Sequence, residues 1–123
     1  MSDVWPNDVW PTDITVRDSG RRLAISFDNG ETGEITAELL RVESPSAEVK
    51  GHGPGQEQLV WGKRNVHIAR AEAVGNYAVR LIFDDGHSTG IFTWVYLRKL
   101  LAEGEALFAA YELKLSEAKL GRG

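Results

Sequence analysis

Short apolar segments alternate with turn sequences along most of the chain, and the spacing becomes helical toward its end. Leu23, Ile25 and Phe27 alternate with Ala24 and Ser26, which is the period-two pattern of a half-buried strand. The same reasoning predicts further strands at residues 14–16, 59–61, 66–71, 78–83 and 88–92. The chain is therefore rich in short strands, and their close spacing favours antiparallel pairing.

Two tight turns are expected at residues 28–30 and 84–86, where Asp-Asn-Gly and Asp-Asp-Gly tolerate positive φ. The first turn leads through a second strand to Leu40 and Arg41. The second turn leads in the same way to Leu97 and Arg98. This echo indicates either a duplicated hairpin-plus-helix unit or only the features that hairpins share.

Helical spacing is found at residues 37–40, 94–101 and 105–119, with Gly104 expected to separate the last two helices. Ser44 suits the N-cap of one more short helix, and Pro45 suits its first position. Residues 121–123 are expected to fray. Together these elements predict an α+β fold: a mainly antiparallel sheet of five to seven short strands, short helices and a longer C-terminal helix.

The chain has the length of one domain, 123 residues, which we divide into an extended arm (1–9), a central region (10–101) and a C-terminal helix and tail (102–123). A repeated Asp-Val-Trp-Pro sequence, at residues 3–6 and 8–11, runs from the arm into the central region, and each proline biases the tryptophan before it toward extended backbone. An apolar content of 42% with 26% charged residues is typical of a globular protein rather than a disordered one.

Charge and hydropathy exclude several classes of protein. The net charge is −4 with both signs spread along the chain, so we expect no nucleic-acid partner, which would need a clustered basic face. No apolar segment approaches the roughly 18 residues of a membrane span. The first residues have neither the basic start nor the apolar run of a signal peptide, and we expect a cytoplasmic protein. There is no cysteine.

Several short motifs, in order, resemble the gamma-butyrobetaine hydroxylase-like N-terminal domain family. They are Leu40-Arg41-Val42, Ser44-Pro45-Ser46-Ala47-Glu48-Val49, Gly51-His52-Gly53, Val74-Gly75-Asn76-Tyr77-Ala78 and residues 83–91. The resemblance covers residues 10–101. It implies a domain that precedes an oxygenase domain in the hydroxylases, and that is also found fused to P-loop iron–sulfur carrier proteins.

The resemblance also implies a structural zinc site, held in the hydroxylases by three cysteines and one histidine. Laid on this sequence, the cysteine positions fall on Ser44, Ser46 and Val49, and the histidine position falls on His87. A serine hydroxyl is a poor zinc ligand at neutral pH, and valine provides none. We therefore expect no structural zinc and no required cofactor.

Catalytic motifs are absent from the sequence. The His-x-Asp element of the iron oxygenases is missing, no nucleophile elbow surrounds a serine, and no Gly-Lys-Ser/Thr follows the glycines at 51–55. We expect no enzyme.

His87 is the most informative candidate residue because it follows Asp84, Asp85 and Gly86 at a hairpin tip. One interpretation is a weak divalent-metal or ligand site formed with these carboxylates and joined by His52. The other is a turn histidine hydrogen-bonded to a backbone group or to Asp85.

A second candidate is a shallow polar recess formed by Arg41, Asn76, Tyr77 and His87. The alternative is that Asn76 serves only in a tight turn between strands.

Three functions follow, in order of preference. The first is a non-catalytic protein-interaction or accessory module linked to metal or iron–sulfur handling, whose partner, by family analogy, is an iron–sulfur carrier or an oxygenase-type protein. The second is a small metal- or ligand-binding protein that uses His87 and its neighbouring carboxylates. The third is a structural homo-oligomer formed through the C-terminal helix.

Overall fold

The computed structural model describes residues 9–45, 60–88 and 90–123. In chain order its elements are β1 (Pro11–Arg17), the 3-10 turn η1 (Asp18–Gly20), β2 (Arg22–Phe27), β3 (Thr32–Thr36), α1 (Ala37–Val42), β4 (Ile68–Val74), β5 (Ala78–Phe83), β6 (Gly90–Thr93) and α2 (Trp94–Ala118). The expected α+β class is confirmed. The strands, however, form two antiparallel three-stranded sheets, β1-β2-β3 and β4-β5-β6, rather than one.

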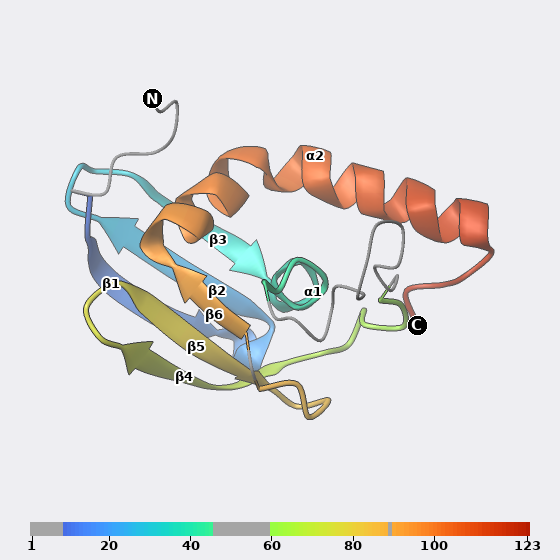
Figure 1. The fold of residues 1–123 in the computed structure, drawn as a ribbon, viewed down its shortest axis with the longest axis horizontal. Coiled ribbons are helices and arrows are strands. Elements are labelled where there is room, and N and C mark those ends of the chain that lie inside the picture. The colour runs from blue at the N-terminus through green and yellow to red at the C-terminus, as the bar shows by residue number, and fades with distance from the viewer. Residues whose placement is uncertain (1–8, 46–59, 89) are drawn as a thin grey trace.

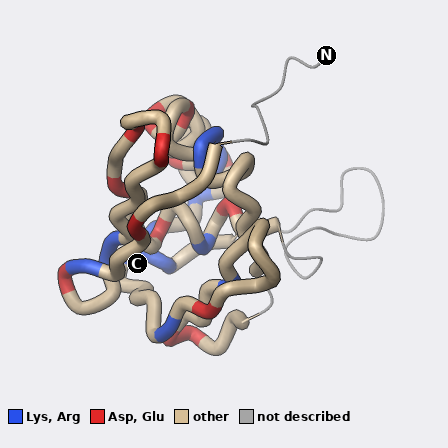
Figure 2. Tube along the Cα trace, turned by 90° about the vertical axis from the view of Figure 1, so that its left-hand side faces the viewer, with Lys and Arg blue, Asp and Glu red and all other residues tan. Residues whose placement is uncertain are grey.

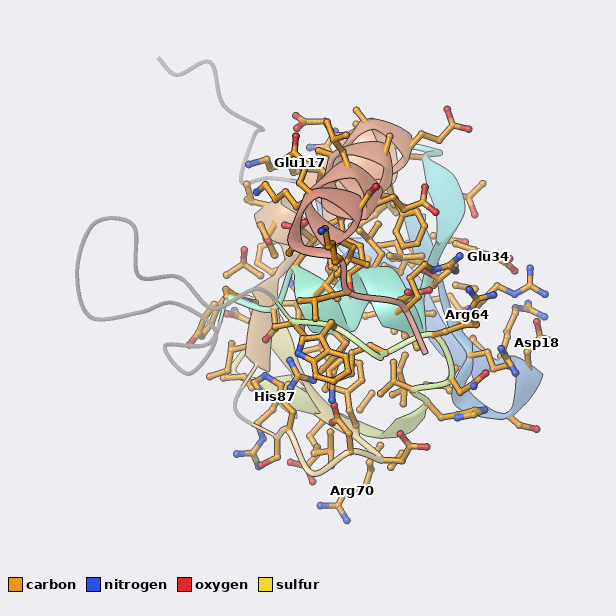
Figure 3. All side chains as sticks on the ribbon, turned by 90° about the vertical axis from the view of Figure 1, so that its right-hand side faces the viewer. Asp18, Glu34, Arg64, Arg70, His87 and Glu117 are labelled. Carbon is orange, nitrogen blue, oxygen red and sulfur yellow. The ribbon has the colours of Figure 1, made fainter. Side chains whose placement is uncertain are left out.

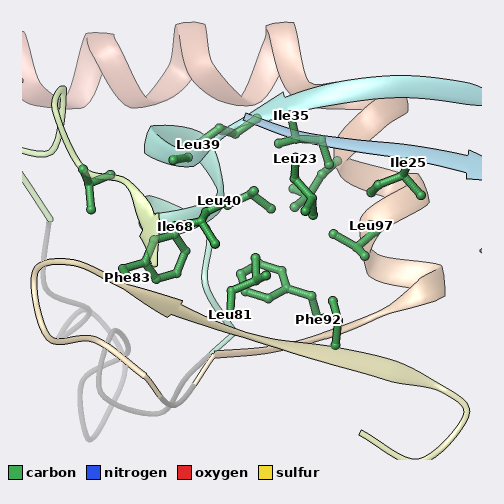
Figure 4. Close-up of a cluster of buried hydrophobic side chains, with 14 of the residues drawn as sticks. Leu23, Ile25, Ile35, Leu39, Leu40, Ile68, Leu81, Phe83, Phe92 and Leu97 are labelled. Carbon is green, nitrogen blue, oxygen red and sulfur yellow. The ribbon is translucent and has the colours of Figure 1, made fainter. Parts of the chain in front are cut away.

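The two sheets enclose one hydrophobic core, and α2 crosses over β3 (Figure 1). Figure 4 shows Leu23 and Ile25 of β2 facing Leu81 of β5 and Phe92 of β6, with Leu97 of α2 at the same level. These five side chains are almost completely excluded from solvent. The period-two pattern of the strands therefore supplies one apolar face from each sheet, and burial of these faces is the main force that holds the fold together.

The two halves of the chain repeat the same local structure. In the β2–β3 turn, the Asn29 Oδ1 atom accepts a hydrogen bond from the Glu31 N–H at 3.0 Å. In the β5–β6 turn, the Asp85 Oδ1 atom accepts one from the His87 N–H at 3.1 Å. The first strand of each half also carries an irregularity near its start, opposite the last residue of the next strand. These equivalences favour a duplicated hairpin-plus-helix unit over the alternative that the echo reflects only features that hairpins share.

Each half also sends an arginine from its helix to the hairpin turn of the other half. Arg41 of α1 donates from Nε to Asp85 Oδ2 at 2.8 Å. Arg98 of α2 donates from Nε and Nη2 to the two carboxylate oxygens of Glu31, at 2.7 and 2.8 Å. The two ion pairs thus link the two halves of the molecule, and each half supplies the arginine of one pair and the carboxylate of the other.

The two helices begin alike but end differently. The hydroxyl of Thr36 caps α1 and that of Thr93 caps α2, each accepting a backbone N–H at 3.1 Å. The predicted break at Gly104 was wrong, because α2 continues to Ala118. A Cβ atom at position 104 would lie 3.3 Å from the Leu39 side chain. Glycine thus lets α2 approach α1 closely, and packing outweighs its low helix propensity.

Several other boundaries differ from the predictions. β1 is longer than residues 14–16, β4 begins at Ile68 rather than 66, β6 begins at Gly90, and residues 60 and 61 are not in a strand. Ser44 and Pro45 do not start a helix within the described residues, and the rest of that expected helix lies outside them. The arm also lies outside, except for residue 9.

The prediction that residues 121–123 fray was wrong. The backbone of the tail (residues 119–123) is hydrogen-bonded to the segment at 62–64: the Gly62 N–H donates to Gly121 O at 3.0 Å, and the Arg64 N–H donates to Arg122 O at 2.6 Å.

Acidic and basic residues are interspersed over the described trace, with no single face of one sign (Figure 2). Within the described ranges, none of the helices combines the length and the apolar character that crossing a membrane requires.

Candidate functional site

The hairpin turn between β5 and β6 holds His87 against the end of α1. The imidazole Nε2 atom of His87 lies 3.0 Å from the Ser44 hydroxyl oxygen, and both residues are buried, at 6% and 3% exposure. Gly90 makes room for this pair, since a Cβ atom there would lie only 2.4 Å from Ser44 Oγ. The turn histidine is thus engaged with a serine from the other half of the molecule.

Asp85 is the electrostatic centre of this cluster. Its Oδ2 atom accepts from Arg41 and also lies 2.7 Å from Lys63 Nζ, while its Oδ1 atom binds the His87 backbone N–H. Burial alone would raise the pKa of Asp85. The hydrogen bonds from Lys63, His87 and Arg41 have the larger, opposite effect, and they lower the pKa to about 2. Asp85 is therefore ionised and fully engaged at neutral pH.

The residues expected to form a metal site are only partly brought together. Asp84 binds His67 rather than His87: its Oδ1 atom accepts the His67 backbone N–H at 3.0 Å, and its Oδ2 atom lies 3.2 Å from His67 Nδ1. Within the described ranges no group of three or more His, Cys, Asp and Glu side chains could hold an ion. His52 lies outside the described residues.

Two of the four positions that the family resemblance assigned to zinc ligands, Ser44 and His87, do lie side by side. The other two, Ser46 and Val49, are outside the described residues. A neutral hydroxyl and one imidazole are a weak donor set for zinc, which prefers thiolate and several imidazoles. The absence of a structural zinc remains a prediction.

The proposed polar recess is not formed. Asn76 and Tyr77 lie at the start of β5, whereas His87 follows its end. At the start of β5, the Asn76 carbonyl accepts from the indole N–H of Trp94 at 2.9 Å, and the Tyr77 carbonyl accepts the Trp94 backbone N–H. Of the four residues, only Arg41 and His87 are close together, through Asp85.

A groove that the sequence reasoning missed lies between α2, α1 and β3, and we call it the α2 groove. It has a volume of about 450 Å³. Its floor is apolar and includes Leu39, Leu101 and Phe108. Four glutamates also line it: Glu34, Glu105 and Glu112 are exposed, and Glu38 is buried. His87 lies on a different side of the molecule from Glu34 (Figure 3), so the groove and the His87 cluster are separate.

Arg122 of the tail occupies one end of the α2 groove. Its guanidinium donates from Nε and Nη2 to the two oxygens of Glu38, at 2.9 and 2.8 Å. Its Cζ atom lies 5.0 Å from the centre of the Phe108 ring, and its Nη1 atom lies 3.7 Å from Glu112. The hydrogen bond with Glu38 raises the pKa of Arg122 above its ordinary value. This is a complete guanidinium site.

One sequence signal could have indicated the groove. Glu38 stands in the otherwise apolar run Ala37-Glu38-Leu39-Leu40, and its side chain is only 7% exposed. A buried carboxylate needs a cation or several hydrogen bonds. The cation is Arg122, which lies 84 residues further along the chain, so no local sequence pattern indicates the pair.

The Ser44–His87 pair does not form a catalytic triad with Asp85. Asp85 contacts the backbone N–H of His87, not its ring, so it does not orient the imidazole as a triad carboxylate does. Ser44, at 3% exposure, is also out of reach of a substrate.

Fold and sites together define a small α+β domain of two similar halves, with a closed polar cluster at one end and an acidic groove beneath its long helix. The chain belongs to the gamma-butyrobetaine hydroxylase-like N-terminal domain family, whose model matches residues 14–98.

Solved structures agree with this assignment. Two NMR solution structures share 40% and 44% sequence identity with the chain, with TM-scores of 0.78 and 0.79, and cover 92% and 96% of it over 89% of their own lengths. A crystal structure of a protein of unknown function of the DUF971 family from Acidithiobacillus ferrooxidans shares 43% identity. It has a TM-score of 0.63 and covers 76% of this chain and 93% of its own. No functionally curated protein matches the chain.

Proposed function

We propose that this protein is a non-catalytic interaction module that binds a segment of another protein in the α2 groove. The observation that carries the proposal is the groove itself, about 450 Å³ in volume, with an apolar floor and four glutamates in its lining. An apolar groove with a few charged groups at its edge is a common form of peptide-binding site.

The chemistry of the two sites favours binding over catalysis. The described residues that line the groove include no His, Cys, Ser or Lys. The Ser44–His87 pair is buried, and Asp85 is already engaged by two cations. These groups of the His87 cluster are therefore used internally, while the α2 groove offers shape and negative charge.

Family analogy suggests the class of partner. The resemblance to domains that precede an oxygenase, or that are fused to iron–sulfur carriers, makes such proteins the first candidates, within metal or iron–sulfur handling in the cytoplasm. That analogy rests on the fold and the family, so the partner must be identified by experiment.

The test compares two charge reversals on the same helix, Glu105→Lys in the groove and Glu117→Lys outside it. Both residues are exposed, so both variants should fold. The tagged proteins are used to capture partners from cells, and binding of each captured protein is measured again after it is purified. We expect a partner that binds the wild type and the Glu117→Lys variant but loses affinity at least tenfold with Glu105→Lys. Equal binding by both variants would refute the proposed surface.

The same preparations test the metal-binding alternative. The protein is purified without chelator and its metal content is measured beside that of His87→Ala. A stoichiometric metal that is lost in the variant, together with loss of partner binding, would replace the groove by the His87 cluster as the functional site.

A further inference from the structure

We infer that the α2 groove recognises an arginine in a segment of the partner, and that Arg122 of the chain itself holds this position in the free protein. The inference rests on the proposed function and names the chemistry of the partner. It follows from how Arg122 is bound.

The site selects a guanidinium rather than an ammonium group. Glu38 receives two parallel hydrogen bonds from the planar fork of Arg122, and the fork lies 5.0 Å from the Phe108 ring centre. A lysine could make only one of these bonds well and would stack poorly on the ring. Glu112 adds a second carboxylate on the remaining nitrogen. The site thus recognises shape as well as charge.

The backbone of the occupant is recognised as well. The N–H groups of Gly62 and Arg64 donate to the carbonyls of Gly121 and Arg122, so backbone hydrogen bonds hold the main chain of the occupant beside this segment. The donor segment is itself anchored, because the buried Tyr111 hydroxyl donates to the Val60 carbonyl at 2.7 Å. A tyrosine hydroxyl is protonated at neutral pH, and burial raises the pKa of Tyr111 further, to about 12.

A glycine is favoured directly after the arginine. Gly123 has a φ of +128°, a backbone conformation that other residues rarely adopt, and it lies in van der Waals contact with the backbone of Gly62. The expected partner sequence is therefore an arginine followed by a glycine.

The groove has capacity beyond Arg122. Of the four glutamates that line it, Glu38 and Glu112 pair with Arg122, and Glu34 pairs with Arg22 at 3.2 Å. Glu105 has no ion-pair partner among the described residues. The volume of about 450 Å³ remains open while Arg122 is in place. A partner segment can thus add an apolar side chain over Leu39 and Leu101 and a second cation near Glu105, which the tail does not supply.

Exchange of the tail for a partner requires that the partner bring its own cation. Glu38 is 7% exposed, and a buried carboxylate left without a counter-charge is strongly destabilising. A neutral segment therefore cannot displace Arg122, whereas an arginine-bearing one can. The tail therefore competes with ligands for the α2 groove and excludes those that bind weakly or carry no positive charge.

The experiment supplies the tail sequence in trans. The probe is the acetylated and amidated peptide Lys-Leu-Gly-Arg-Gly, and its control replaces arginine by citrulline, which keeps the shape without the charge. Binding to the full chain is measured by calorimetry and by the amide resonances of Gly62 and Arg64. We expect Arg122→Ala to bind the arginine peptide at least tenfold more tightly than the wild type binds it. We expect the same variant to bind the citrulline peptide at least tenfold more weakly than it binds the arginine peptide.

Further variants keep the test decisive. Arg122→Ala/Glu38→Gln should lose the preference for arginine over citrulline, because the carboxylate that recognises the charge is gone. If Arg122→Ala does not fold, Arg122→Lys takes its place, and a several-fold gain over the wild type for the arginine peptide is expected. Equal affinity of Arg122→Ala (or its lysine substitute) for the two peptides, or no binding of either, would overturn the inference.

Failure of this inference can be told apart from failure of the proposed function. If partner capture depends on Glu105 but the peptides do not bind, the groove is a binding surface without an arginine site. If the peptides bind as expected but partner capture is the same for Glu105→Lys and Glu117→Lys, the arginine site serves only the tail and the inference about a partner is wrong.

Discussion

Neutralisation of Asp85 should weaken the fold, because this carboxylate joins three separate segments of the chain. It binds Arg41 of α1, Lys63 of the segment before β4 and the backbone N–H of His87. The perturbation is Asp85→Asn, which keeps the shape and removes the charge. The variant should be less stable than the wild type at neutral pH.

The magnitude follows from the pKa. A folded-state pKa of about 2, against an ordinary 3.8, corresponds to about 2 kcal/mol of stability at neutral pH. Residual exposure of the side chain, 17%, reduces this to about 1–2 kcal/mol. Because the folded-state pKa is the lower one, the stabilisation is complete above about pH 5 and is lost as the pH falls toward 2.

The assay is the free energy of unfolding in urea at pH 6, 4 and 3 for the wild type and Asp85→Asn. The difference between them should fall by roughly half from pH 6 to pH 3. Asp13→Asn is the control, because Asp13 is exposed and has no ion pair among the described residues. A wild-type advantage that is unchanged at pH 3 would show that Asp85 is not stabilised by these contacts.

Three further predictions are tested by the same urea unfolding. Gly90→Ala should lower the free energy of unfolding by about 1–3 kcal/mol, because the added Cβ atom clashes with Ser44. Adding Ser44→Ala should recover part of this loss, and strictly additive effects of the two changes would contradict the prediction. Thr93→Ala should cost about 1 kcal/mol by removing the cap of α2, whereas Thr93→Ser should cost much less. Leu97→Ala, at a fully buried site, should cost about 2–5 kcal/mol, against less than about 0.5 for the exposed Leu113→Ala; similar losses at the two positions would argue against the packing.

The features that could be predicted from the sequence are those fixed by neighbours along the chain. The alternation at Leu23, Ile25 and Phe27 indicated β2, and the similar segment at 78–83 matches β5 to the residue. The two turns, and the helical turn at Ala37, were also found because their signals are local. The echo between the halves was detectable for the same reason.

The errors arose where a distant contact decides the structure. Gly104 was expected to end a helix by its propensity, but its contact with Leu39 makes glycine useful there. The tail was expected to fray by its composition, but Arg122 finds the buried Glu38. Neither contact can be read from the neighbouring sequence, because each joins segments more than sixty residues apart.

The candidate sites show the same division. The approach of Ser44 to His87 was implied by the family resemblance, whereas no local pattern joins residues 43 positions apart. Asn76 and Tyr77 were grouped with His87 by their polarity, but a full strand separates them. The α2 groove was missed because its walls come from three elements.

The difference between the two halves explains where the groove arises. Both halves end in a Thr-capped helix that sends an arginine to the opposite turn, yet α1 has 6 residues and α2 has 25. Because α2 is longer, it extends past α1 and lies over part of α1 and β3. Residues of these three elements form the apolar floor and the acidic lining of the α2 groove. A strictly symmetric molecule would have no such overhang. Function in this domain is therefore expected where the repeat is broken, at the part of α2 beyond Leu101 and the tail that folds back from it.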